Sequence, residues 1–157
     1  MSAVVVDIYS AAVAGGPMKP LSQAILEAGR GLVGDRYYSG AGTFSEKLKD
    51  KPDSQLTLIE SEEVARFASA AALSIGAGDL RRNIVTRGVR LNDLVGKRFR
   101  VGGAVLEGIR LCEPCSYLAG RVVPQVLPGL VHRAGLRAQI IQGAVVRPGD
   151  PIDLASP

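Results

Sequence analysis

The sequence predicts a β-rich fold, a mostly antiparallel β-barrel with a few short peripheral helices. Short apolar and β-branched runs separated by turn residues recur along the chain and amount to seven or eight expected strands. Two or three helical patterns fall on the connections between these strands. The sequence shows no βαβ alternation and none of the Gly-rich phosphate-binding motifs of nucleotide-binding sheets. These observations favour a curled antiparallel sheet over a doubly wound parallel one.

The expected strands are short and are bounded by Gly, Pro or charged residues. "QLTLIE" combines β-branched content with alternation, and a Gly102–Gly103 connection predicts a β-hairpin between two later runs. In chain order the strands are "VVVDI" (4–8), "QAILEAG" (23–29), "QLTLIE" (55–60), "RRNIVTRGV" (81–89), the two arms of "KRFRVGGAVLEGIRL" (97–111), "LRAQIIQG" (136–143) and "PIDLA" (151–155).

The clearest helix is expected in "SEEVARFASAAAL" (61–73). Ser61 is placed to be its N-cap, acidic residues fill its first turn, and Val64, Phe67 and Ala71 form an apolar stripe. Two shorter helices are predicted further on. One lies in "CEPCSYLAGRV" with Pro114 in its first turn, and the other in "PQVLPGLVHRAG", broken by Pro128 and ended near Gly135.

Composition and charge narrow the class of protein. The 157 residues predict one domain, 1–157, and the apolar runs are much shorter than a membrane span of about 20 residues. The N-terminus lacks the pattern of a signal peptide, so a cytoplasmic location is expected. The net charge is +4, and Arg outnumbers Lys, which favours oxyanion ligands unless Arg-rich codon usage explains it. Dispersed basic residues and 4% aromatics argue against a nucleic-acid partner.

Both cysteines of the chain, Cys112 and Cys115, stand in "RLCEPCSYL" (110–118). A structural zinc site needs four ligands, but the chain has one C-x-x-C and one histidine, His132. A thioredoxin-type couple needs a βαβ context that is not visible here. Two buried thiols, or one working thiol beside a bystander, remain the stronger alternatives. A turn that opens a helix would lower the pKa of a thiol, and Cys115 is the better placed of the two.

Several longer motifs resemble a known family. They are "GRGLVGDRYYSGAGTFS", "QLTLIESEEV", "LRRNIVTRGVRLNDLVGKRFRVGGAVLEGIRLCEPC" and "LVHRAGLRAQIIQGAVVRPGDPI", in this order along the chain. Together they closely resemble the MOSC domain, named for the C-terminal part of molybdenum-cofactor sulfurase. The resemblance runs from about Lys19 to Ile152. It implies a β-barrel that binds the molybdenum cofactor (molybdopterin), or carries sulfur for it.

The resemblance also implies roles for individual residues. The family's hallmark cysteine, a molybdenum ligand or a proposed persulfide carrier, matches Cys115, and Cys112 is its neighbour. Asp35 and Arg36, in "GDR", match the position where relatives use the arginine to contact the phosphate end of the cofactor. The remaining matches are Arg81 and Asn83 in "LRRN", on the segment that contacts pterin and phosphate, and Lys19 in "PMKP", where the match is loose.

Each assignment has a structural alternative. Asp35 and Arg36 are also suited to stabilising a turn, and Asn83 to a turn position. Arg81 and Arg82 could form a solvated strand end, and neighbours on a strand face opposite ways, so only one of them should point inward. His132 fits a structural position better than a catalytic one, although it is the only imidazole in the chain.

The resemblance implies two functions. The first is a molybdenum-dependent reductase of N-hydroxylated compounds, with Cys115 as metal ligand and a separate flavin or iron–sulfur protein as electron donor. The second is a non-catalytic carrier of persulfide sulfur or of the cofactor, with a sulfur-donor or sulfur-acceptor enzyme as partner. The chain has no room for the pyridoxal-phosphate domain of the sulfurases, so no PLP site is expected. The polar segment 37–54 is either a solvated surface loop or a lid that closes over the cofactor, with Phe44 as its apolar contact when closed.

Overall fold

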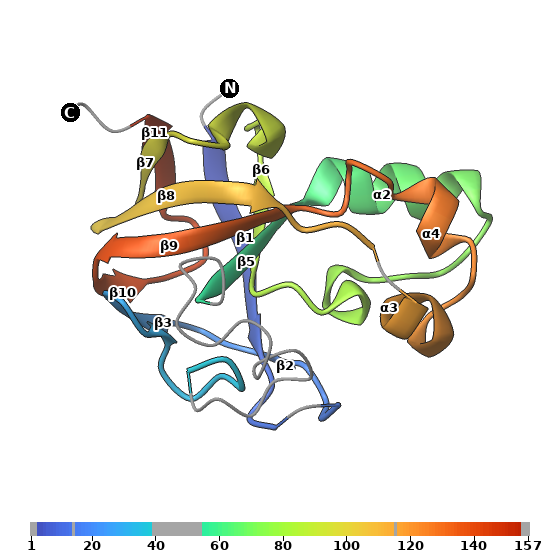
Figure 1. Ribbon diagram of the computed structural model, residues 1–157, viewed down its shortest axis with the longest axis horizontal. Coiled ribbons are helices and arrows are strands. Elements are labelled where there is room, and N and C mark those ends of the chain that lie inside the picture. Colours follow the sequence, from blue (N-terminus) through green and yellow to red (C-terminus); the bar gives the residue numbers. More distant parts are fainter. Residues whose placement is uncertain (1–2, 14, 39–54, 115, 155–157) are drawn as a thin grey trace.

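The computed structural model describes residues 3–13, 15–38, 55–114 and 116–154. Within them, seven strands close into a barrel, and most of their pairings are antiparallel (Figure 1). The expected mostly antiparallel β-barrel with few helices is therefore confirmed. Around the barrel the strands follow the order β1 (Ala3–Ser10), β11 (Pro151–Leu154), β7 (Arg98–Val101), β8 (Ala104–Leu111), β9 (Leu136–Gln142), β5 (Leu56–Glu60) and β6 (Ile84–Arg87), which pairs with β1.

Closure of the barrel joins the first and last strands. Ala3 of β1 lies opposite Ile152 of β11 in an antiparallel pair. The predicted hairpin is also confirmed: Val101 of β7 pairs with Ala104 of β8 across a two-residue connection. Gly102 in that connection has φ 58°, a left-handed conformation that glycine adopts at little cost.

The structure contains short strands beyond those expected from the sequence. They escaped prediction because two or three residues are too few to show an alternating pattern. These strands are β2 (Lys19–Pro20), β4 (Gly31–Leu32) and β10 (Ala144–Val146). β2 pairs with the end of β1, whereas β10 and β4 flank the expected β3 (Ala24–Glu27) in a separate three-stranded sheet.

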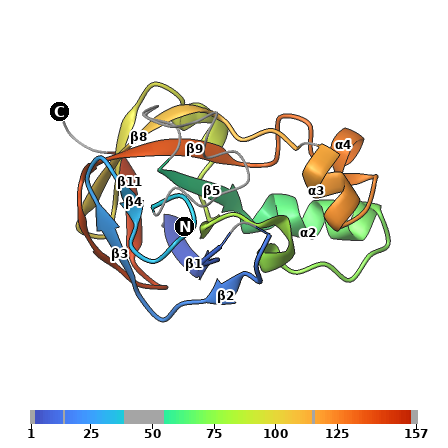
Figure 2. The ribbon, with the colours of Figure 1, turned by 60° about the horizontal axis from the view of Figure 1, so that its bottom comes forward.

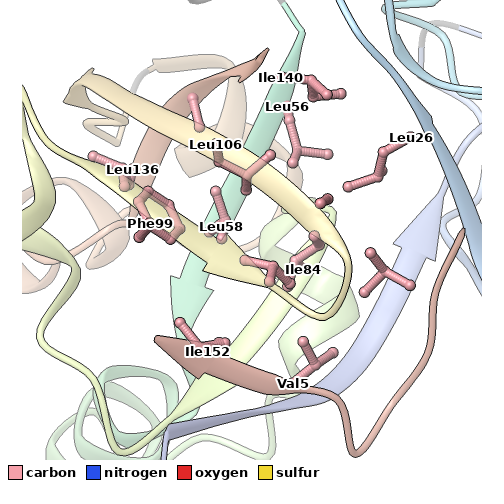
Figure 3. Close-up of a cluster of buried hydrophobic side chains, with 14 of the residues drawn as sticks. Val5, Leu26, Leu56, Leu58, Ile84, Phe99, Leu106, Leu136, Ile140 and Ile152 are labelled. Atoms are coloured by element: carbon pink, nitrogen blue, oxygen red, sulfur yellow. The ribbon is translucent and has the colours of Figure 1, made fainter. Parts of the chain in front are cut away.

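The barrel interior is filled by aliphatic side chains and Phe99 (Figure 3). Alternation along the strands selects these residues, because successive side chains point to opposite faces. Leu56 and Leu58 of β5 point inward and are completely buried, whereas Ile59 belongs to a second cluster outside the barrel.

The helices α2 (Ser61–Ala70), α3 (Ser116–Arg121) and α4 (Val126–Gly129) gather on one side of the barrel (Figures 1 and 2). The second cluster binds them to the outer faces of β5 and β6. Its buried members are Ile59, Val64, Phe67, Leu80, Val85, Leu118, Val126, Leu130 and Ala134.

The stretch from β5 to β6 corrects one expectation. β5 and β6 are neighbours and run parallel, and α2 lies on the connection between them. This is one βαβ unit, although the sequence showed no such alternation. The unit was missed because a loop and the 3₁₀ helix η2 (Ala77–Leu80) separate α2 from a strand of only four residues.

The helices themselves differ in detail from the predictions. Glu60, not Ser61, is the N-cap of α2, because Glu60 keeps the extended backbone of β5 while Ser61 is already helical. Val64 and Phe67 are buried as the predicted stripe requires. Pro114 precedes α3 rather than lying in its first turn, and Pro128 lies within α4 instead of breaking a helix. Proline is tolerated there because the first-turn N–H groups of a helix have no intrahelical partner.

None of the helices within the described residues is long and apolar enough to cross a membrane. Of the predicted lid over 37–54, only Tyr37 and Tyr38 belong to the described residues, and Phe44 lies outside them. The lid therefore stays a prediction.

Candidate functional site

Asp35 is the centre of a buried polar cluster that follows β4. Its side chain is completely buried. Oδ1 accepts hydrogen bonds from the Ala11 backbone N–H (3.1 Å), from Arg36 Nη1 (3.1 Å) and from Asn83 Nδ2 (3.3 Å). Oδ2 accepts one from the Tyr37 backbone N–H (3.2 Å). The carboxylate therefore ties together three segments that are far apart in the sequence.

Arg36 extends this cluster toward Arg81. Its Nη1 pairs with Asp35, and its Nη2 donates to the Arg81 carbonyl oxygen at 3.2 Å. The Tyr37 ring lies over the guanidinium, 4.6 Å from Cζ to the ring centroid. Asp35 and Arg36 thus form the pair expected for a stabilised turn, and the pair also holds the backbone of a second candidate residue.

Asn83 fixes the other side of the cluster. Its Nδ2 donates to the Tyr9 carbonyl (3.1 Å) and to Asp35 Oδ1, and its Oδ1 accepts from Thr57 N–H (3.1 Å) and Thr57 Oγ1 (3.2 Å). An amide side chain has two donor hydrogens and one acceptor oxygen with two lone pairs. All of these groups are used within the protein, so Asn83 holds the strands in place around the cluster.

Arg81 has an unusual backbone conformation at the end of η2. Its φ of 62° and ψ of 33° lie in the left-handed region, which costs a non-Gly residue about 1–3 kcal/mol. The Arg36 side chain holds the Arg81 carbonyl, and Arg81 Nη1 donates to the Gly16 carbonyl at 2.7 Å. These bonds offset the strain and direct the Arg81 side chain toward the 16–18 segment.

We expected only one of Arg81 and Arg82 to point inward, but both are buried, with 6% and 8% of their surface exposed. Arg82 Nε donates to the Ala134 carbonyl (2.8 Å) and Nη2 to the Cys112 carbonyl (3.1 Å). Arg81 and Arg82 precede β6, so the opposite-facing rule of a strand does not apply to them. The hypothesis that Arg81 and Arg82 form a solvated strand end is therefore wrong.

Arg82 and Gly135 position the start of the cysteine segment. The Cys112 N–H donates to the Gly135 carbonyl at 2.8 Å, and Arg82 holds the Cys112 carbonyl. Gly135 has φ 114°, and a Cβ there would overlap the carbonyl oxygen of Leu58. Cys112 itself is a buried free cysteine. Cys115 lies outside the described residues, so its role as ligand stays a prediction; α3 starts at the next residue.

His132 occupies a surface position near the same segment. Its backbone N–H donates to Glu113 Oε1 (2.7 Å), and its Nδ1 lies 2.6 Å from Glu113 Oε2. The side chain is 70% exposed, and the backbone has φ 60°. This pairing is consistent with a structural position for His132.

A cleft of about 750 Å³ lies beside the polar cluster. Arg81 lines it, and so does Met18, whose sulfur is 3.6 Å from Arg36 Nη1. Apolar side chains from two separate segments, Leu73, Ile75, Val122 and Val123, form much of the rest of its lining. The cleft therefore combines a guanidinium group with apolar walls.

Tyr9 and Arg121 also line this cleft, and neither was predicted from the sequence. Tyr9 is half-buried, and burial, together with the charges of Asp7 and Asp79, raises the pKa of its phenol above the usual value of 10.0. The hydroxyl is thus protonated at neutral pH and can donate a hydrogen bond. Arg121 is the last residue of α3, and no local sequence pattern shows that it lines the cleft.

The structure brings four of the predicted site residues together: Asp35, Arg36, Arg81 and Asn83. Lys19 is an exposed residue of β2, and its side chain takes no part in the hydrogen bonds of this cluster among the described residues. Within the described part of the chain, no group of three His, Cys, Asp or Glu residues is arranged to hold a metal ion.

Comparison with known proteins identifies the family. A model of the MOSC domain matches residues 45–153. The chain belongs to the MOSC family. MOSC domains are associated with molybdenum-cofactor binding, so the chain is a molybdenum-cofactor-associated MOSC protein. No match was found among the curated proteins.

Solved structures share the MOSC protein's fold along nearly its whole length. YuaD from Bacillus subtilis is 19% identical with a TM-score of 0.78, over 97% of this chain and 94% of that one. YiiM from Geobacillus stearothermophilus is 16% identical with a TM-score of 0.75, over 98% of this chain and 75% of that one. YiiM from Escherichia coli is 20% identical with a TM-score of 0.68, over 100% and 71%. At these identities the similarity establishes the fold alone.

Proposed function

We propose that this MOSC protein binds the molybdenum cofactor in the cleft beside Arg81 and acts as a reductase of N-hydroxylated compounds. The observation that carries the proposal is the cleft itself, which joins a held guanidinium group to apolar walls. Its volume of about 750 Å³ lies within the range of about 300–1,000 Å³ of small-molecule sites. Guanidinium groups suit the cofactor's phosphate, and apolar walls suit its flat pterin.

The residues of the cluster have distinct parts in this proposal. Arg81 would contact the phosphate end, whereas Asp35, Arg36 and Asn83 would hold Arg81 in its left-handed conformation. The Cys115 thiolate would ligate molybdenum, because soft thiolates suit such metals. The cofactor, when bound, supplies the redox chemistry that breaks an N–O bond.

The overall reaction consumes two electrons and two protons, and releases the oxygen of the N–OH group as water. A separate flavin or iron–sulfur protein would supply the electrons. Tyr9 lines the cleft and carries a neutral hydroxyl, so it would donate a hydrogen bond to a polar group of the bound ligand.

Metal and pterin analysis tests this proposal. We expect protein purified from a cofactor-making, molybdenum-replete host to contain equimolar molybdenum and pterin, and to reduce an N-hydroxylated compound when given an artificial electron donor. Cys115→Ala should lose the molybdenum and the activity, because the thiolate ligand is gone.

Cys112→Ala is the matched control. Buried free cysteines pack as small hydrophobes, so this change should cost about 1 kcal/mol of stability and leave the molybdenum content unchanged. A metal-free wild-type protein carrying cyanide-labile sulfur on Cys115 would support the persulfide carrier instead. Wild-type protein with neither molybdenum nor labile sulfur would contradict both functions.

A further inference from the structure

Arg121 brings a second guanidinium-bearing side chain to the cleft, from a part of the fold distant from the polar cluster. It is the last residue of α3, and it is exposed. Arg81 comes from the end of η2, about forty residues earlier in the chain. The packing of α3 against α2 and α4 through the second hydrophobic cluster brings these two arginines to one cavity.

The charges that line the cleft favour an anion. Arg81 and Arg121 are its cationic side chains, and Asp79 is its only carboxylate among the described residues. Asp79 Oδ2 already accepts a hydrogen bond from the Gly76 N–H at 2.9 Å, so this carboxylate has a place in the turn before Arg81. Tyr9 adds a neutral donor to the same lining.

The two arginines differ in how firmly they are held. Arg81 is fixed through the Gly16 carbonyl and through its own backbone, which Arg36 holds. Arg121 is an exposed side chain at a helix end, where a cation also interacts favourably with the helix dipole. That interaction involves α3 alone, and it does not explain why Arg121 lines the same cavity as Arg81.

We propose that Arg81 and Arg121 are the two arms of a site for a phosphate monoester attached to an apolar or aromatic group. The Arg81 side chain is already held in place before the ligand binds, whereas the exposed Arg121 side chain adjusts its position to the ligand. The apolar residues Val122 and Val123, which follow Arg121 directly, provide the contact for the organic part. This inference rests on the proposed function and adds a residue that neither the sequence pattern nor the family resemblance pointed to.

Titration with phenyl phosphate, followed by NMR or calorimetry, tests the site without any bound molybdenum. Arg121→Gln should weaken binding about tenfold or more, because a charge-assisted hydrogen bond contributes about 1.5–3 kcal/mol. Arg121→Lys should recover part of the affinity, since the charge returns without the planar fork. Arg147→Gln removes an equal charge from an exposed loop outside the cleft lining and should leave binding unchanged.

Pterin content of the same variants identifies the source of the phosphate. If Arg121→Gln weakens phenyl phosphate binding and also lowers the pterin bound by purified protein, the ligand is the cofactor's own phosphate. If it weakens phenyl phosphate binding alone, the site serves another phosphate monoester and the cofactor binds elsewhere, so this inference stands while the proposed function fails. Equal binding by Arg121→Gln and wild type, or an equal loss in Arg147→Gln, overturns the inference.

Discussion

Asp35→Ala is expected to lower the free energy of unfolding by about 3–5 kcal/mol, because it removes one partner of a buried ion pair. The carboxylate accepts four hydrogen bonds, and its loss leaves the buried Arg36 guanidinium without the charge it pairs with at 3.1 Å. Urea unfolding measures the effect. Asp35→Asn keeps an acceptor oxygen but not the charge, and should cost less, about 1–3 kcal/mol.

An exposed ion pair in the same protein provides the control. Asp93 lies 3.6 Å from Arg90, and both side chains are about two-thirds or more exposed. Asp93→Ala should therefore cost less than about 1 kcal/mol. If Asp35→Ala destabilised the protein no more than Asp93→Ala does, Asp35 would not be the centre of a buried polar cluster.

Phe67→Ala is expected to lower the free energy of unfolding by about 3–5 kcal/mol and to loosen the packing of the helices beside the cleft. Phe67 is 2% exposed in the second hydrophobic cluster, and its ring packs so closely on Gly129 of α4 that a Cβ there would stand 2.5 Å from the ring. A cavity at this point loosens α4 and, through Leu118, α3. Because α3 carries Arg121, affinity for phenyl phosphate should fall together with stability.

Ser69→Ala is the matched control on α2, since Ser69 is exposed on the same helix. It should change the free energy of unfolding by less than about 0.5 kcal/mol and leave phenyl phosphate binding unchanged. Full binding by folded Phe67→Ala protein would show that the helical cluster does not shape the cleft.

Local patterns in the sequence were enough to predict several elements of the fold. β5 and α2 were predicted because alternation and a helical stripe each act over a few neighbouring residues. The β7–β8 hairpin was predicted because its two-residue glycine connection leaves few other conformations. Closure of the barrel through Ala3 and Ile152 joins the two ends of the described chain, and no local pattern records such a pairing.

The candidate site was only partly accessible from the sequence. Family motifs pointed to Asp35, Arg36, Arg81 and Asn83, which the structure gathers into one cluster. The separate role of each residue could not be predicted from the sequence, because Arg36 donates a hydrogen bond to a carbonyl 45 residues away along the chain. Arg121 was missed because its approach to the cleft depends on how α3 packs, not on its neighbours in the sequence.

We propose that the molybdenum cofactor binds in the cleft beside Arg81. Anomalous scattering from molybdenum in crystals of cofactor-loaded protein locates the metal. We expect one strong peak at the cleft lined by Tyr9, Arg81 and Arg121, with the Cys115 sulfur bound to the metal. A peak away from this cleft, for example at the smaller cavity of about 350 Å³ beside Ile152, would show that the cofactor binds elsewhere.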